Sequence, residues 1–249
     1  MVMVGRKIIG AEVPPPQEEQ RGRAFVRLYA ALVILATLGF GALVFIVRDE
    51  DVLANFDVPV THALQSVHLS VYDWVLRNAS DFGWFPLSAI TYAGVFAALF
   101  ALRLRLEAVV GIASSLLAAG AGSLLKAAID RARPSGALVH VVAHLGGYSF
   151  PSGHVIEYTT LFGFTFFVVW AAWRNSLARN LVLLALLVLV TLVGPSRVYL
   201  GEHWPSDAIG AYLFGSLWLA GTIEVLLALK PRVGAWWRGR PHRKRWSTV

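Results

Sequence analysis

The chain has 249 residues, of which 57% are hydrophobic and only 15% are charged, and its mean hydropathy is +0.61. This composition excludes an ordinary water-soluble domain and indicates a protein of the lipid bilayer. The formal net charge is +7, and the lack of cysteine excludes disulfides, thiolate chemistry and cysteine metal sites.

Six apolar segments predict six transmembrane helices, because a span needs about 20 apolar residues. The expected fold is therefore an all-α integral membrane bundle. Charge is absent from the first two segments, while Glu157 interrupts the fourth and Glu224 the sixth. The six expected spans are residues 28–47, 82–102, 108–125, 155–173, 180–196 and 208–229.

The distribution of lysine and arginine predicts the orientation, since short loops rich in these residues stay in the cytoplasm. With both termini cytoplasmic, 16 of the 22 cations lie inside. We expect a disordered cytoplasmic tail over residues 1–24, a six-span domain over 25–229 and a basic cytoplasmic tail over 230–249. The outward cations are Arg48, Arg77, Lys126, Arg131, Arg133 and Arg197.

The outward polar residues fall into three clusters. In "KAAIDRARP", Lys126 and Arg133 are seven residues apart, so both lie on one face if the third helix continues to Pro134. In "PSGH", His154 opens the fourth span. A single such cluster is more often an interfacial cation or a satisfied polar residue.

The third cluster is "SRVYLGEHWPSD", in which Ser196 and Arg197 end the fifth span while His203 and Asp207 enter the sixth. Pro205 is typical of a first helical turn, which places Asp207 in that turn. Three clusters at the membrane surface that is otherwise poor in cations indicate an anion site.

The residue types suit a phosphate group. Arginine binds phosphate through paired N–H donors and lysine as a point charge, which fits Lys126, Arg133 and Arg197. The start of the fourth span offers free backbone N–H groups, and Gly153 allows a close backbone approach. Ser152 either caps this helix or donates its hydroxyl to the phosphate.

The remaining residues suit catalysis. His203 and Asp207 resemble a nucleophile with its orienting carboxylate, which keeps one imidazole nitrogen protonated and the other free. His154 is then available for proton transfer to the leaving oxygen. Glu157, one helical turn beyond His154, has either a supporting role at the site or a structural hydrogen bond within the bundle. Glu224 is expected to be structural.

The patterns K-x6-R-P, P-S-G-H and S-R-x5-H-x3-D, in this order, resemble the signature of the phosphatidic acid phosphatase type 2 superfamily over about residues 84–229. The resemblance implies a six-helix core and hydrolysis of lipid phosphates through a phosphohistidine, with no metal and no cofactor. It implies catalysis by His203, His154 and Asp207. It implies phosphate binding by Lys126, Arg133, Ser152, Gly153 and Arg197.

Expected substrates are undecaprenyl diphosphate, phosphatidylglycerol phosphate or phosphatidic acid, presented at the extracytoplasmic face of the cell membrane. Two other functions stay open: a lipid transporter or scaffold with an inactive site, and an enzyme like the vanadate-dependent haloperoxidases. The basic tail "WWRGRPHRKRW" favours membrane lipids over nucleic acid as a partner. The oligomeric state is left open.

Overall fold

The computed structural model describes residues 16–238, and within these residues every regular element is helical. The predicted all-α class is therefore confirmed. The tails expected at the two ends of the chain lie partly in residues 1–15 and 239–249, outside the described residues. The first and last helices extend past the expected domain limits at residues 25 and 229, because one begins at Pro16 and the other ends at Arg238.

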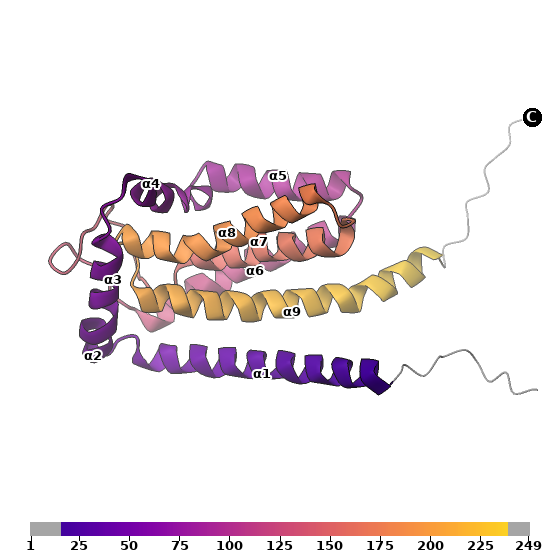
Figure 1. The fold of residues 1–249 in the computed structure, drawn as a ribbon, viewed down its shortest axis with the longest axis horizontal. Coiled ribbons are helices and arrows are strands. Elements are labelled where there is room, and N and C mark those ends of the chain that lie inside the picture. The colour runs from indigo at the N-terminus through magenta and orange to yellow at the C-terminus, as the bar shows by residue number, and fades with distance from the viewer. Residues whose placement is uncertain (1–15, 239–249) are drawn as a thin grey trace, which may run out of the picture.

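Within residues 16–238, six long helices form the bundle, and five short elements lie between the first two of them (Figure 1). The long helices are α1 (Pro16–Ile46), α5 (Leu87–Ala101), α6 (Arg105–Ile129), α7 (Gly153–Ala172), α8 (Leu177–Tyr199) and α9 (Pro205–Arg238). The short elements are α2 (Glu50–Val52), the π-helical turn η1 (Leu53–Asp57), α3 (Val58–Gln65), α4 (Ser70–Asn78) and the 3₁₀ turn η2 (Asp81–Gly83).

Helix α7 is the centre of the bundle and packs against α6, α8 and α9. It is apolar around most of its circumference, and this pattern is typical of a helix that is surrounded by others. Val155, Tyr158 and Leu161 from α7 are almost completely buried in the main core cluster. Helix α1 lies at the edge and packs along α9 (Figure 1). The PSGH cluster predicted to bind an anion leads into the first residue of α7, Gly153.

Five described helices are long and apolar enough to cross a membrane, and a sixth span exists only if the bent pair of residues 70–83 and 87–101 is counted as one. The expected span over residues 82–102 is thus broken near its start, and α5 covers residues 87–101 of it. The two parts meet at 64°. Pro86 explains the break, because proline disfavours a helical residue before it and lacks the N–H needed within a helix.

The short elements lie together at one end of the bundle, where α3 crosses the ends of the long helices (Figure 1). Gln65 of α3 joins the loops at this end: its Nε2 donates to the carbonyl oxygens of His140, at 2.7 Å, and Tyr199, at 2.9 Å. The segments that lead into α7 and α9 run through the same end. All three polar clusters are therefore brought to one end of the membrane bundle.

Candidate active site

His203 and Asp207 form a contact at the entrance to α9. His203 Nδ1 lies 3.5 Å from Asp207 Oδ2, and the same carboxylate oxygen accepts a hydrogen bond from the Trp204 N–H at 2.8 Å. Asp207 lies in the first turn of α9, as expected, and His203 lies in the loop before this helix. With Nδ1 facing the carboxylate, we assign the ring proton to Nδ1 and the lone pair to Nε2.

Burial sets the protonation state of His203, which is only 2% exposed. Burial lowers the pKa of this imidazole to about 4, and the carboxylate of Asp207 opposes that effect by raising the pKa. The ring is therefore neutral near pH 7. Its Nε2 lies 3.2 Å from Nη1 of Arg133, so the free nitrogen faces a guanidinium group.

Arg133 reaches this position from an irregular segment, because α6 ends at Ile129. The condition that the third helix continues to Pro134 is therefore not met. Asp130 takes the left-handed conformation with φ 52°, which aspartate tolerates better than most residues, and this turns the chain. Arg48 donates to the carbonyl groups of the last turn of α6. Lys126 and Arg133 therefore do not meet by lying on one face of a single helix.

Loop carbonyl groups hold these two cations. Lys126 Nζ donates to the carbonyl oxygens of Tyr148 and Ser149 at 3.0 and 3.3 Å. Arg133 Nε contacts the carbonyl oxygens of Gly146 and Gly147, each at 3.2 Å, and burial lowers the pKa of its guanidinium. The charges of both cations remain available to an anion, because their partners here are neutral.

Arg197 is fully buried near the end of α8. Its Nη1 donates to Ser80 Oγ at 2.9 Å, and its guanidinium lies over the ring of Trp84, 5.2 Å from the centroid. It also forms an ion pair with Glu202. Its Nε has no hydrogen-bond partner among the described residues. One donor of the third cation is therefore left for a ligand.

Ser152, Gly153 and His154 form the start of α7. Ser152 is the N-cap residue, but its buried hydroxyl caps no N–H and has no partner in the described part of the chain, so the capping alternative is wrong. The Nε2 atom of His154 is likewise buried and unpaired there. The His154 ring packs on Trp84, with centroids 4.6 Å apart, and Gly83 approaches so closely that a Cβ would overlap this ring.

An ion network behind Asp207 was not predicted. Arg131 Nη1 donates to Asp207 Oδ1 at 2.5 Å, and its Nη2 donates to Asp57 Oδ2 at 2.5 Å. Ser206 joins the network, because its N–H and hydroxyl both donate to Asp57 Oδ1, at 2.9 and 2.8 Å. All four residues are at most 4% exposed.

The sequence offered a signal for only part of this network. Arg131 stands two residues before Arg133, and an extra cation beside a motif residue could have been noticed. Asp57, Ser80 and Trp84 lie in segments without any motif, so no pattern pointed to them. The structure thus brings the motif residues together and adds supporting groups from the first third of the chain.

Comparison with known proteins places this chain in a family. The model of the PAP2 superfamily matches residues 106–230. Phosphatidylglycerophosphatase B of Bacillus subtilis is 35% identical over 95 residues, 38% of this chain and 45% of that protein. The putative undecaprenyl-diphosphatase YbjG of Escherichia coli is 34% identical over 110 residues, 41% of this chain and 51% of that protein. The match to these two relatives thus spans about half of their length.

A third relative and two solved structures extend the comparison. Dolichyldiphosphatase 1 of Rhinolophus ferrumequinum is 30% identical over 165 residues, 61% of this chain and 68% of that protein. The first transmembrane PAP2 type phosphatidylglycerolphosphate phosphatase from Bacillus subtilis superposes with a TM-score of 0.67 at 21% identity, covering 86% of this chain and 98% of that one. Aquifex aeolicus LpxE gives 0.53 at 18% identity, covering 68% and 94%. Both solved structures share the fold of this chain.

Proposed function

The chain belongs to the PAP2 superfamily, and on this premise we propose that it hydrolyses a lipid phosphate or diphosphate at the extracytoplasmic face of the membrane, without a metal ion and through a phosphohistidine. One observation carries the proposal: the unprotonated Nε2 of His203 faces the guanidinium of Arg133 at 3.2 Å, while Asp207 lies behind the same ring. The names of all three relatives describe lipid phosphatases, which supports the substrate class.

Three cations bind the phosphate in this proposal. Lys126 and Arg133 exchange loop carbonyl oxygens for phosphate oxygens, and Arg197 offers its unpaired Nε. The hydroxyl of Ser152 has no protein partner among the described residues and donates to the same group. The backbone N–H of Gly153, at the start of α7, adds a donor at the positive end of the helix dipole.

The reaction then proceeds in two displacements. In the first, His203 Nε2 forms a bond to phosphorus, the bond from phosphorus to the lipid oxygen breaks, and its electron pair stays on that oxygen, which takes a proton from His154. Asp207 stabilises the positive charge on the His203 ring. In the second, His154 takes a proton from water as the water oxygen attacks phosphorus, and the bond from nitrogen to phosphorus breaks. Inorganic phosphate leaves and both histidines regain their initial states.

Arg131 and Asp57 fix the carboxylate that this mechanism uses. Arg131 holds one oxygen of Asp207 at 2.5 Å, so the other oxygen stays directed at His203. Asp57 in turn accepts a hydrogen bond from the other terminal nitrogen of Arg131, Nη2, and the Ser206 hydroxyl accepts one from Nη1. These residues act through Asp207 and are therefore positioning residues. Arg131 needs both carboxylates as partners, because a buried arginine without them would carry an uncompensated charge.

The test is phosphate release by the purified full chain in mixed micelles that contain phosphatidylglycerol phosphate, phosphatidic acid or undecaprenyl diphosphate. We expect hydrolysis of at least one lipid, undiminished by EDTA and inhibited by vanadate, which mimics five-coordinate phosphorus. A phosphate label on the denatured protein after a brief reaction is the expected intermediate. Hydrolysis that EDTA abolishes and magnesium restores would contradict the mechanism.

The proposed face of the membrane has its own test. The chain has no cysteine, so single cysteines can be placed at Ala137, in the loop beside the site, and at Ser176, at the opposite end of α7. Both positions are exposed. In intact cells an impermeant thiol reagent should label Ala137→Cys but not Ser176→Cys, which should react only after permeabilisation. The reverse pattern would place the site in the cytoplasm.

A further inference from the structure

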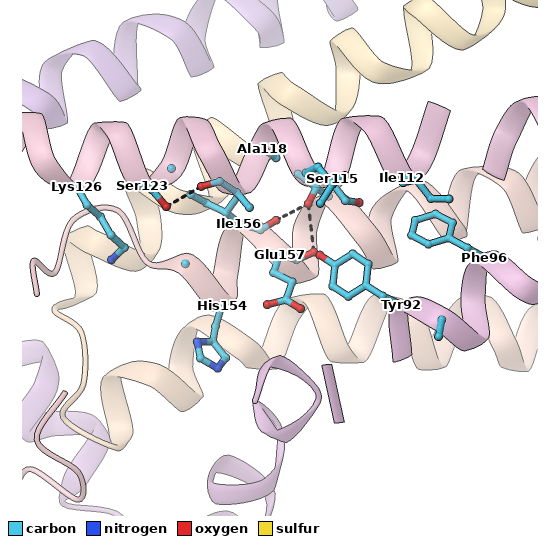
Figure 2. A pocket seen from close by; sticks show the side chains of 16 residues that line it. Tyr92, Phe96, Ile112, Ser115, Ala118, Ser123, Lys126, His154, Ile156 and Glu157 are labelled. Carbon is cyan, nitrogen blue, oxygen red and sulfur yellow. Dashed lines mark hydrogen bonds between the residues drawn. The ribbon is translucent and has the colours of Figure 1, made fainter. Parts of the chain in front are cut away.

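A groove of about 710 Å³ between α5, α6 and α7 leads away from the site (Figure 2). Its walls are mainly apolar, with side chains such as Phe96, Ile112 and Ile156. At one end it is lined by Lys126, Gly153 and His154, whereas His203 does not line it. The groove therefore opens on the His154 side of the site.

The geometry of phosphoryl transfer decides which part of a substrate enters this groove. The attacking and leaving atoms lie roughly in line on opposite sides of phosphorus. With His203 as the proposed nucleophile, the leaving group extends toward His154 and into the groove. The atoms that follow the breaking bond must then pass the side chains just beyond His154.

Glu157 is the next residue of α7 on that path, one helical turn beyond His154. Figure 2 shows its carboxylate directed into the groove, between the side chains of His154 and Tyr92. The Tyr92 hydroxyl is hydrogen bonded to Ser115. Among the described residues, none forms an ion pair or a hydrogen bond with the Glu157 carboxylate. A carboxylate at membrane depth without a protein partner is costly, and such residues usually serve a function.

We propose that Glu157 determines substrate specificity: it favours a lipid monophosphate whose leaving alcohol carries a hydroxyl next to the ester carbon, and it disfavours diphosphates. A hydroxyl donates a charge-assisted hydrogen bond to the carboxylate. A diphosphate instead places a second anionic phosphate on the leaving side, where two like charges repel each other strongly in an apolar groove. This inference rests on the proposed function and refines its substrate class.

Lys126 does not remove this discrimination, although it also lines the groove. Its Nζ is directed to the carbonyl oxygens of Tyr148 and Ser149, at the phosphate end of the site. It therefore neutralises the phosphate that reacts. Glu157 lies beyond His154, next to the atoms that depart.

The experiment compares kcat/KM of the full chain and of Glu157→Gln, which keeps the shape of the side chain and removes its charge. The substrates are phosphatidylglycerol phosphate, its deoxy analogue with propanediol in place of the headgroup glycerol, and undecaprenyl diphosphate. The wild type should prefer the hydroxyl-bearing lipid over the deoxy analogue by about tenfold, as expected for one charge-assisted hydrogen bond. In Glu157→Gln this preference should shrink to about twofold or less, and the rate with the diphosphate should rise about tenfold.

A matched control is available in α9, where Glu224 is a second carboxylate within a predicted span and does not line the groove. Glu224→Gln should leave all three ratios unchanged. Equal effects of Glu157→Gln on the three substrates would overturn the inference while leaving the proposed function intact. Failure of the wild type to hydrolyse any of these lipids, and phosphatidic acid as well, would instead overturn the proposed function. If Glu157→Gln does not fold, the wild-type ratio for the hydroxyl and deoxy pair decides, and a ratio near one refutes the role of Glu157.

Discussion

The two sides of the phosphate site differ in how completely their polar groups are satisfied. On the His203 side, Asp207, Arg131 and Asp57 form a closed set of ion pairs with distances of 2.5 Å. On the His154 side, the Nε2 atom of that histidine and the hydroxyl of Ser152 are buried without partners among the described residues. The carboxylate behind the proposed nucleophile is thus held in place before substrate binds, whereas the His154 side has buried polar groups that a ligand could pair.

This difference has an energetic meaning. A buried donor or acceptor without a partner costs about 1–3 kcal/mol, so the folded protein tolerates a destabilised His154 side. The closed set of ion pairs contributes little net stability by itself, because desolvation offsets the attraction, but loss of one member leaves a bare buried charge. Substitutions on the two sides should therefore differ in how they affect stability and activity.

The largest effect is expected for His203→Ala, which removes the atom that attacks phosphorus in the proposed mechanism. Turnover should fall by about 10⁴-fold or more, as for other removed nucleophiles, and no phosphate label should remain on the protein. The measurements are phosphate release and labelling, with the melting temperature in detergent as a control for folding. Activity near that of the wild type in a folded variant would refute the mechanism.

His154→Ala should affect substrates unequally. A lipid monophosphate leaves as a basic alkoxide and needs a general acid, which is typically worth about 10² to 10⁴ in rate. A lipid diphosphate leaves as a phosphate monoester, whose second pKa is about 6, and needs little protonation. Release of the leaving group in a single turnover should therefore slow much more for the monophosphate.

Single-turnover conditions are needed because the proposed mechanism also uses His154 to activate water in the second displacement. Steady-state rates could fall equally for both substrates. If the first turnover slows equally as well, His154 is a phosphate ligand rather than the acid, and the contrast between the two sides no longer concerns proton transfer.

The closed side can be probed by a double-mutant cycle of Arg131→Met and Asp57→Asn. Arg131→Met leaves two buried carboxylates unpaired and should lower the free energy of unfolding by about 3–5 kcal/mol. Adding Asp57→Asn removes one of these charges, so the double variant should recover part of the loss. Denaturant or thermal unfolding in detergent measures this coupling.

The control is Arg77→Met, which breaks the half-exposed pair of Arg77 and Asp73. Exposed pairs contribute only about 0–1 kcal/mol, so this variant should remain close to the wild type. Strictly additive effects of Arg131→Met and Asp57→Asn would show that the two residues are not coupled.

The smallest effect concerns pH. His203 has a pKa of about 4 in the folded protein, lowered mainly by burial, whereas an unfolded histidine titrates near about 6.5. Between these values the unfolded chain binds more protons, so this contribution to stability is complete above about pH 6.5 and declines as pH falls toward about 4.

The melting temperature of the wild type should therefore fall more steeply than that of His203→Asn between about pH 7 and about pH 4.5. The other groups that titrate in this range are common to both proteins, so the difference between the two curves reports on His203 and its contact with Asp207. Parallel curves would mean that burial does not depress this histidine in the folded state.

The sequence predicted the residues of the site better than the means by which they meet. Motif spacing identified Lys126 and Arg133, but the helix that was expected to align them ends at a left-handed Asp130, and a local backbone reversal of this kind has no hydrophobic signature. Likewise, counting uncharged residues predicted one span over residues 82–102, although Pro86 breaks it. The hydrophobic pattern of a sequence indicates which residues are buried. A chain reversal or a break in a helix does not alter that pattern enough to be recognised.

Asp57 shows a second limit. It forms its ion pair with a residue 74 positions away, and no local pattern encodes a partner at that distance. Arg131 was visible in the sequence, but its charge alone could not distinguish a phosphate ligand from a support for Asp207. Only the directions of its two terminal nitrogens, one toward each carboxylate, make that distinction.

The carbonyl groups of residues 146–149 bear on the last event of each catalytic cycle. They accept hydrogen bonds from Lys126 and Arg133. In the proposed mechanism, departing inorganic phosphate therefore leaves behind donors that these carbonyl groups pair again. Product release then exchanges one set of hydrogen bonds for another and does not expose bare cations. Product inhibition by inorganic phosphate should accordingly be weak. The loop of residues 146–149 would then determine the rate of product release.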